Sequence, residues 1–251
     1  MFDTKMKAGK KLLVPFVTVG YPTLDATPAI VRALEKAGAD AIELGIPFSD
    51  PLADGPVIQR ASQRALENGV TLASALELAG RLERSVPLFV MGYVNPIERF
   101  GVERFADSCA RARIAGAIVP DLPLDEAGEL RAAFAARDLH WVPLAAPTTP
   151  DERLARLGEA ATAFLYCVSV AGTTGGCELP KDLEKFLART RRATKRPRLV
   201  GFGISDAATA KRAAKAADGV IVGSALLDRI AAAKDPADAA RRFLEPLREA
   251  L

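Results

Sequence analysis

Short apolar segments rich in strand-forming residues alternate along the chain with longer segments of helical periodicity. Eight short segments have the length and composition of buried strands: Leu12–Thr18, Ala39–Leu44, Leu88–Met91, Ala115–Pro120, Trp141–Ala145, Ala163–Val168, Leu199–Phe202 and Gly219–Val222. The amphipathic segments between them include Ala29–Ala37, Leu72–Arg84, Val102–Ala112, Ala127–Ala136, Lys181–Ala193 and Ala207–Ala216. A pattern that switches repeatedly between these two periods predicts βα units and a parallel sheet.

Eight such units on 251 residues favour a closed barrel over an open doubly wound sheet. The sequence contains no stretch that reads as an interdomain linker and no low-complexity tract. We therefore expect an α/β protein in which residues 1–251 form a single domain, a (β/α)8 TIM barrel.

Two expected connections are much longer than the others. They are Gly45–Gly69, after the second strand, and Ser169–Pro180, after the sixth. Loops that follow barrel strands lie on the face where active sites are built. Three prolines restrain the first connection, whereas three glycines leave the second free to move, as a lid requires.

The charges of the chain are balanced and mixed along its length. There are 34 basic and 31 acidic residues, so neither a nucleic-acid partner nor a membrane surface is expected. The three cysteines suit a reducing cytoplasm better than a disulfide framework. No apolar run approaches the length of a bilayer span, and the basic N-terminal residues do not form a signal peptide. We expect a cytoplasmic protein.

A glutamate, Glu43, interrupts the second apolar segment. By strand alternation it shares a side with Ala39 and Ala41, opposite Ile42 and Leu44. A glutamate facing the helix layer would be a buried unpaired charge, so Glu43 is expected to point into the barrel lumen. Apolar surroundings raise the pKa of such a carboxyl group and suit it to proton transfer near neutral pH. The alternative is a salt bridge to a neighbouring strand end.

Two further acids, Asp50 and Asp54, lie in the loop after this strand. Asp50 precedes Pro51 and Asp54 precedes Gly55, so each can also be explained as a turn residue. Their chemistry alone does not choose between them.

Small residues follow the last two expected strands in a way typical of phosphate sites on barrels. Gly203 and Gly223 allow the main chain to approach phosphate oxygens, and Ser224 offers a hydroxyl that can also cap the following helix. Gly175, in the second long connection, can supply a further N–H group.

The sequence lacks the residues that other kinds of catalysis would need. No lysine falls near the C-terminal end of an expected strand, which argues against a Schiff base, and the cysteines and the single histidine lack metal-ligand spacing. There is no Walker loop, and no dinucleotide fingerprint follows the first strand. We expect acid–base catalysis with no cofactor and no metal.

The sequence ELGIPFSDPLADGPVIQ at Glu43–Gln59 strongly resembles the α subunit of tryptophan synthase. The likeness continues in the family's order over nearly the whole chain, through Val14–Thr18, Met91–Pro96, Pro120–Pro123, Gly172–Gly175, Gly201–Ser205 and Gly223-Ser224. This resemblance implies retro-aldol cleavage of indole-3-glycerol phosphate to indole and D-glyceraldehyde 3-phosphate.

The resemblance also implies roles for individual residues. Glu43 is the implied acid–base group, and Asp54, rather than Asp50, assists at the indole nitrogen. Tyr166 matches a tyrosine near the acids, and Thr174 matches a lid threonine. The matches to the phosphate site are Gly175, Gly203, Gly223 and Ser224. An apolar slot for indole is expected from residues at or near strand ends: Phe16, Tyr93, Ile118, Leu144 and Phe202.

The implied partner is the tryptophan synthase β subunit, which carries the pyridoxal phosphate of an α2β2 complex. The loop with Asp50 and Pro51 and the segment Asn95–Phe100 are expected to lie near it.

There are two alternatives to this complex. One is a free-standing lyase of the same family, and the other is a non-catalytic barrel that binds the phosphate ester or modulates the β subunit. Other phosphate-binding barrels, such as sugar-phosphate isomerases, fit the fold but do not explain the Glu43–Gln59 motif.

Overall fold

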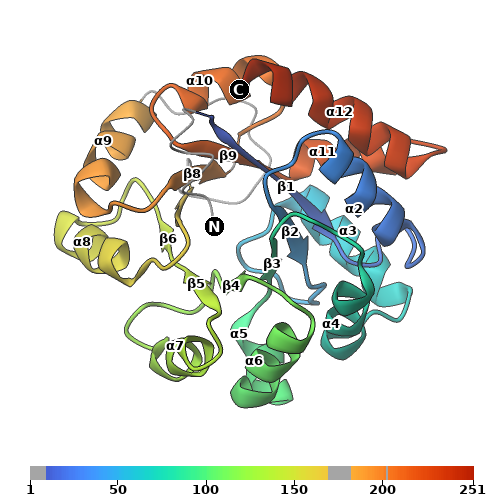
Figure 1. The fold of residues 1–251 in the computed structure, drawn as a ribbon, viewed down its shortest axis with the longest axis horizontal. Coiled ribbons are helices and arrows are strands. Elements are labelled where there is room, and N and C mark those ends of the chain that lie inside the picture. The colour runs from blue at the N-terminus through green and yellow to red at the C-terminus, as the bar shows by residue number, and fades with distance from the viewer. Residues whose placement is uncertain (1–9, 169–181, 202) are drawn as a thin grey trace.

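The computed structural model describes residues 10–168, 182–201 and 203–251, and these form a barrel of parallel strands surrounded by helices (Figure 1). Nine strand segments make up the sheet: β1 (Leu12–Thr18), β2 (Ile42–Gly45), β3 (Leu88–Met91), β4 (Gly116–Ile118), β5 (His140–Val142), β6 (Leu144–Ala145), β7 (Leu165–Val168), β8 (Arg198–Gly201) and β9 (Gly219–Val222). Their order is β5-β4-β3-β2-β1-β9-β8-β7-β6, so chain neighbours are also sheet neighbours except β5 and β6, which stand at the two ends. The predicted barrel is confirmed.

A proline divides the predicted fifth strand, Trp141–Ala145, into two segments. β5 pairs with β4, and β6 pairs with β7 after Pro143. Proline has no N–H group to donate to a ladder, so pairing is interrupted there. The carbonyl of Pro143 still accepts a hydrogen bond from the Tyr166 N–H at 3.0 Å. β5 and β6 together therefore occupy one strand position and bring the two ends of the sheet together.

Helices cover the outside of the barrel (Figure 1). Within the described residues they are α2 (Ala26–Lys36), α3 (Pro56–Glu67), α4 (Leu72–Arg81), α5 (Val94–Phe100), α6 (Val102–Arg111), α7 (Gly128–Ala135), α8 (Asp151–Ala160), α9 (Leu183–Ala193), α10 (Ala207–Ala214), α11 (Ser224–Ala231) and α12 (Pro236–Ala250). None of these helices is both long enough and apolar enough to cross a bilayer.

The first long connection, Gly45–Gly69, is not a loop throughout, and that expectation is wrong. Its second half forms α3, which begins at Pro56. Proline is tolerated at a first helical position because its missing N–H would have no intrahelical partner there. The second long connection, Ser169–Pro180, lies outside the described residues.

Two groups of apolar side chains fill the fold. One lies in the lumen, and the other lies between the strands and the helices. The lumen group consists of Leu12, Val14, Ala41, Phe89, Ile118, Val142, Ala163, Phe164, Tyr166, Leu199 and Ile221. Within it the rings of Phe89 and Phe164 meet edge to face, with centroids 5.2 Å apart. The lumen is thus packed with side chains below the rim, as in other barrels of this kind.

Ionic contacts tie the N-terminal ends of the strands together. Arg248 of α12 donates to the Asp40 carboxylate at 2.8 Å and to the Lys11 carbonyl at 2.8 Å, and Asp40 also accepts from the Leu13 N–H. These contacts hold the last helix against the first strand. Accordingly, α12 lies beside α2 in Figure 1.

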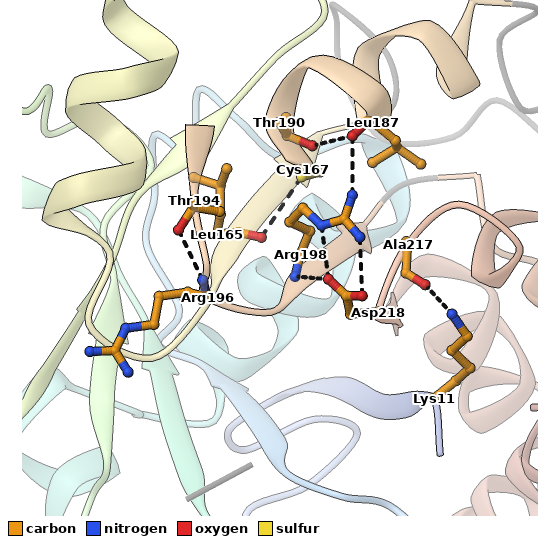
Figure 2. A network of polar contacts seen from close by, with 10 residues as sticks. All are labelled: Lys11, Leu165, Cys167, Leu187, Thr190, Thr194, Arg196, Arg198, Ala217 and Asp218. Carbon is orange, nitrogen blue, oxygen red and sulfur yellow. Dashed lines mark hydrogen bonds and ion pairs between the residues drawn. The ribbon is translucent and has the colours of Figure 1, made fainter. Parts of the chain in front are cut away.

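A second ionic cluster links β8, β9 and α9 (Figure 2). Buried Arg198, at the start of β8, donates through Nε and Nη2 to both carboxylate oxygens of Asp218, at 2.8 and 3.0 Å. Its Nη1 donates to the carbonyl of Leu187 in α9 at 3.1 Å. The guanidinium therefore fastens the strands that lead to the last two loops.

Replacing Arg198 by Met should destabilise the protein strongly. The substitution leaves the half-buried Asp218 without its cation, so we expect a loss of about 3 kcal/mol in the free energy of unfolding and a Tm lower by roughly 10 °C. The matched control is Arg153→Met, because the ion pair between Arg153 and Asp125 is exposed and is expected to contribute less than about 1 kcal/mol. Equal Tm values for the two variants in thermal unfolding would contradict this role.

Candidate active site

Glu43 lies in the middle of β2, between β1 and β3, where it is in register with Phe16 and Phe89. Its side chain is 1% exposed, and neither carboxylate oxygen has a hydrogen-bond partner among the described residues. Burial raises the pKa of Glu43 to about 8, and the nearby charge of Asp54 adds to the rise. The side chain is therefore protonated at neutral pH.

Asp54 lies in the loop between β2 and α3 and is 4% exposed, whereas Asp50 in the same loop is exposed. Burial raises the pKa of Asp54 to about 6, and a hydrogen bond with the Tyr93 side chain limits the rise. Asp54 Oδ1 has no hydrogen-bond partner among the residues that the structure describes. Of the two acids that the sequence left open, only Asp54 is brought to Glu43.

Contacts from two elements hold the loop around Asp54. The Tyr93 hydroxyl accepts a hydrogen bond from the Ala53 N–H at 3.2 Å and also forms a hydrogen bond with the Asp54 carboxyl group. The side-chain amide of Gln59, in the first turns of α3, donates to the Asp54 carbonyl at 2.9 Å. The Phe48 ring lies 5.3 Å from the Tyr93 ring, centroid to centroid. Tyr93 thus supports the carboxylate directly, in addition to offering an aromatic face.

The two carboxyl groups have different protonation states over a range of pH. Between about pH 6 and pH 8, Glu43 keeps its proton while Asp54 is ionised. Two acids whose surroundings separate their pKa values in this way can serve as proton donor and as fixed negative charge. The arrangement is suited to acid–base chemistry on a substrate that enters the lumen.

Glycines at the rim make room for aromatic rings in the lumen. A Cβ atom on Gly201 would lie 2.3 Å from the Tyr166 hydroxyl oxygen, and one on Gly45 would lie 2.4 Å from the Phe16 ring. Tyr166 is buried beside both acids, and burial followed by the charges of Glu43 and Asp54 raises the pKa of its hydroxyl group. The backbone of β2 and β8 therefore determines where these rings lie.

The expected walls of the indole slot are only partly described. Phe16 and Tyr93 are buried, and Ile118 belongs to the lumen group. Leu144 in β6 is half-buried and packs against that group. Phe202, Thr174 and Gly175 lie outside the described residues.

The expected phosphate residues follow β8 and β9. Gly203 has a φ of 74°, a conformation that favours glycine, and it lies between β8 and α10. Gly223 is the N-cap residue of α11, and Ser224 is its first helical residue. The expectation that Ser224 caps this helix is wrong, because the cap position belongs to Gly223 and carries no side-chain cap bond. The N–H groups at the start of α11 are thus not satisfied by a side-chain cap.

Two polar residues near the site escaped the sequence reasoning. Thr18, at the end of β1, is in register with Gly45, and its buried hydroxyl has no hydrogen-bond partner among the described residues. A polar residue that ends an apolar strand was an available signal. Gln59 gave no such signal, because its contact with Asp54 depends on the path of the intervening loop.

The described residues contain no group of three or more histidine, cysteine, aspartate or glutamate side chains arranged to hold a metal ion. No candidate metal centre is therefore assigned within residues 10–168, 182–201 and 203–251.

Comparisons with known proteins agree with the resemblance found in the sequence. The family model described as tryptophan synthase alpha chain matches residues 2–250. The tryptophan synthase alpha chain of Xanthomonas axonopodis pv. citri is 47% identical over 251 residues, covering 97% of this chain and 94% of the relative. That of Xylella fastidiosa strain M12 is also 47% identical, with 96% and 93% covered.

Solved structures give the same result. The tryptophan synthase subunit alpha of Legionella pneumophila superposes with a TM-score of 0.91 at 38% identity, covering 98% of this chain and 95% of the other. A chain of Mycobacterium tuberculosis tryptophan synthase superposes with a TM-score of 0.93 at 35% identity, covering 99% and 95%. The chain therefore belongs to the tryptophan synthase alpha chain family and is a lyase that acts on indole-3-glycerol phosphate.

Proposed function

We propose that Glu43 is the acid–base catalyst of this lyase and that Asp54 is the charge that stabilises the developing cation. Protonated Glu43 gives its proton to ring carbon C3 of the substrate, and the resulting positive charge extends to the indole nitrogen. Ionised Asp54 favours that charge at the nitrogen. The first step therefore needs one protonated and one ionised carboxyl group.

The second step breaks the bond between C3 and the glycerol chain. Glu43, now ionised, accepts the hydroxyl proton of the adjacent carbon, which becomes the aldehyde of D-glyceraldehyde 3-phosphate. The electron pair of the broken bond returns to the ring and restores aromatic indole. Glu43 ends the cycle protonated, so no external proton or redox partner is consumed.

One observation carries this assignment. Glu43 and Asp54 are both buried at the same end of the lumen, and burial separates their pKa values to about 8 and about 6. Burying an acid group without satisfying all of its hydrogen-bonding atoms costs free energy. Such groups are typical of functional sites rather than of structural ones.

The remaining substrate contacts are proposals of the same kind. Phe16, Tyr93, Ile118 and Leu144, with Tyr166 beside the acids, are proposed to enclose the indole ring. Gly203, Gly223 and Ser224 are proposed to bind the phosphate through N–H groups and the Ser224 hydroxyl. Thr174 and Gly175 are proposed for the substrate and phosphate subsites on the sequence resemblance, and Phe202 is proposed for the indole slot on its place at the end of an expected strand.

A partner surface is proposed on the loop that carries Asp54. Leu52 is 82% exposed, and it lines an open hollow of about 670 Å³ together with Asp50, Pro51 and residues of α3. An exposed leucine beside a hollow suits burial by another protein. We propose that the tryptophan synthase β subunit docks here in an α2β2 complex.

We further propose that the whole chain acts as one barrel domain in the cytoplasm.

A barrel that binds the ester without cleaving it is the second candidate. The acid pair of Glu43 and Asp54 does not support this candidate, because binding a phosphate ester needs no protonated carboxyl group in the lumen. The two candidates differ in whether indole is released.

Indole release from indole-3-glycerol phosphate is the direct test. The wild-type chain should release indole, and Glu43→Gln should lower kcat by roughly a thousandfold because the amide cannot donate the proton. Substrate binding should remain, because the amide keeps the size of the side chain. A Glu43→Gln variant with wild-type kcat would contradict the assignment, and a wild-type chain that binds the ester without releasing indole would favour the second candidate.

The pH profile of kcat/KM should be bell-shaped. Activity requires protonated Glu43 and falls as the pH rises through about 8, and it requires ionised Asp54 and falls as the pH drops through about 6. Tyr93→Phe removes the hydrogen bond that lowers the pKa of Asp54, so the acidic limb alone should move to higher pH. A Tyr93→Phe profile that shifts on neither limb would contradict the support role of this hydroxyl.

The partner surface makes a separate prediction. Leu52→Glu places a charge on the proposed interface, so the β-subunit concentration needed for half-maximal stimulation of indole release should rise at least about tenfold. Leu24→Glu is the matched control, because Leu24 is the other large apolar side chain that is exposed among the described residues. Equal concentrations for both variants would remove Leu52 from the interface.

A further inference from the structure

A single buried hydroxyl group, that of Thr209, holds the end of the turn that leads from β8 into α10. Thr209, in the first turn of α10, accepts hydrogen bonds from the Ser205 N–H at 3.0 Å and from the Asp206 N–H at 3.1 Å. The same oxygen lies 2.9 Å from the Asp206 carbonyl oxygen and 3.0 Å from its Oδ1. A hydroxyl group offers one proton and two lone pairs, so these contacts use its full capacity.

Asp206 completes a reciprocal capping box. Its Oδ1 accepts a hydrogen bond from the Thr209 N–H at 2.8 Å, while the Thr209 hydroxyl oxygen accepts one from the Asp206 N–H. The Thr209 side chain is 7% exposed, and therefore water cannot readily replace its hydroxyl. Residues 205 and 206 are thus tied to the helix rather than to the loop before them.

This arrangement determines which N–H groups the turn can present to a ligand. The Ser205 and Asp206 N–H groups donate to Thr209. Of the four residues that lead from Gly203 into α10, only Gly203 and Ile204 therefore have N–H groups that Thr209 does not engage. Gly203 holds a left-handed conformation, and Ile204 is buried. The backbone from Gly203 to Asp206 is therefore fixed at its helix end by Thr209.

We propose that Thr209 is a positioning residue for the phosphate subsite, acting through the turn that carries Gly203. The proposal rests on the proposed function of that turn. Thr209 does not contact the substrate. It sets the geometry of the N–H groups that do, so its loss should weaken phosphate binding and leave the chemistry at Glu43 unchanged.

The chain offers a matched control in α4. Thr71 and Ser74 form a capping box of the same type, in which the Ser74 hydroxyl accepts from the Thr71 N–H at 2.9 Å. Ser74 occupies the helical position that corresponds to Thr209, but neither residue of this box belongs to the loops after β8 and β9. Ser74→Ala therefore removes an equivalent capping contact away from the phosphate turn.

Three variants test the proposal: Thr209→Val, which keeps the shape and removes the hydroxyl; Thr209→Ser, which keeps the hydroxyl; and Ser74→Ala. The measurements are KM and kcat for indole-3-glycerol phosphate and the inhibition constant of inorganic phosphate. Thr209→Val should raise KM and the phosphate inhibition constant about tenfold with kcat within about twofold of wild type. Thr209→Ser and Ser74→Ala should stay within about twofold on all three.

A folded Thr209→Val variant with unchanged KM and unchanged phosphate inhibition would overturn the proposal. If Thr209→Val does not fold, Asp206→Ala replaces it, because Asp206 is exposed and its carboxylate is the other half of the box; unchanged phosphate inhibition there has the same meaning. Wild-type protein that phosphate does not inhibit would instead refute the phosphate site itself. The two failures are therefore distinguishable.

Discussion

The exclusion of water from two carboxyl groups is the constraint on which this site depends. An ionised carboxylate in an apolar lumen is strongly disfavoured unless a hydrogen bond or a cation compensates it. Among the described residues, Glu43 has no hydrogen-bond partner at either oxygen, while Asp54 has the Tyr93 hydroxyl. Burial raises both pKa values, and the hydrogen bond limits the rise only for Asp54. Asp54 therefore ionises first, so the packing of the barrel determines which acid keeps its proton.

The shape of the lumen follows from where side chains are missing. Below the rim it is filled by apolar residues, including the edge-to-face pair of Phe89 and Phe164. At the rim, Gly45 and Gly201 leave space that the rings of Phe16 and Tyr166 occupy. The ionic contacts of Arg198 and Arg248 lie at the opposite end of the strands. Stability and chemistry are thus supplied by opposite ends of the same barrel, as is usual for this fold.

Features that depend on local periodicity could be predicted from the sequence. The position of Glu43 in the lumen follows from strand alternation and from the cost of a buried charge, and β1, β3 and β9 have the predicted bounds. Features that depend on the path of a loop could not. The choice between Asp50 and Asp54 needed the family resemblance. The helix α3 was missed because Pro56 was interpreted as a restraint on a loop, although proline also suits the first position of a helix.

Tyr93 illustrates the same limit. It was expected only as an aromatic wall, yet its hydroxyl is bonded to Asp54, which lies far from it in sequence and reaches it through a separate loop. Pro143 shows the reverse case: the residue was visible in the sequence, but its effect on strand pairing depends on which neighbours the two segments meet.

The protonation state of Glu43 in the free protein tests the account most directly. Carboxyl carbon resonances of selectively labelled glutamate can be followed by NMR as a function of pH, with Glu43→Gln identifying the resonance. We expect a titration midpoint near 8, so that the group is protonated at pH 7. A midpoint near the ordinary glutamate value of about 4.3 would contradict it, because the lumen would then hold two ionised acids and no proton donor.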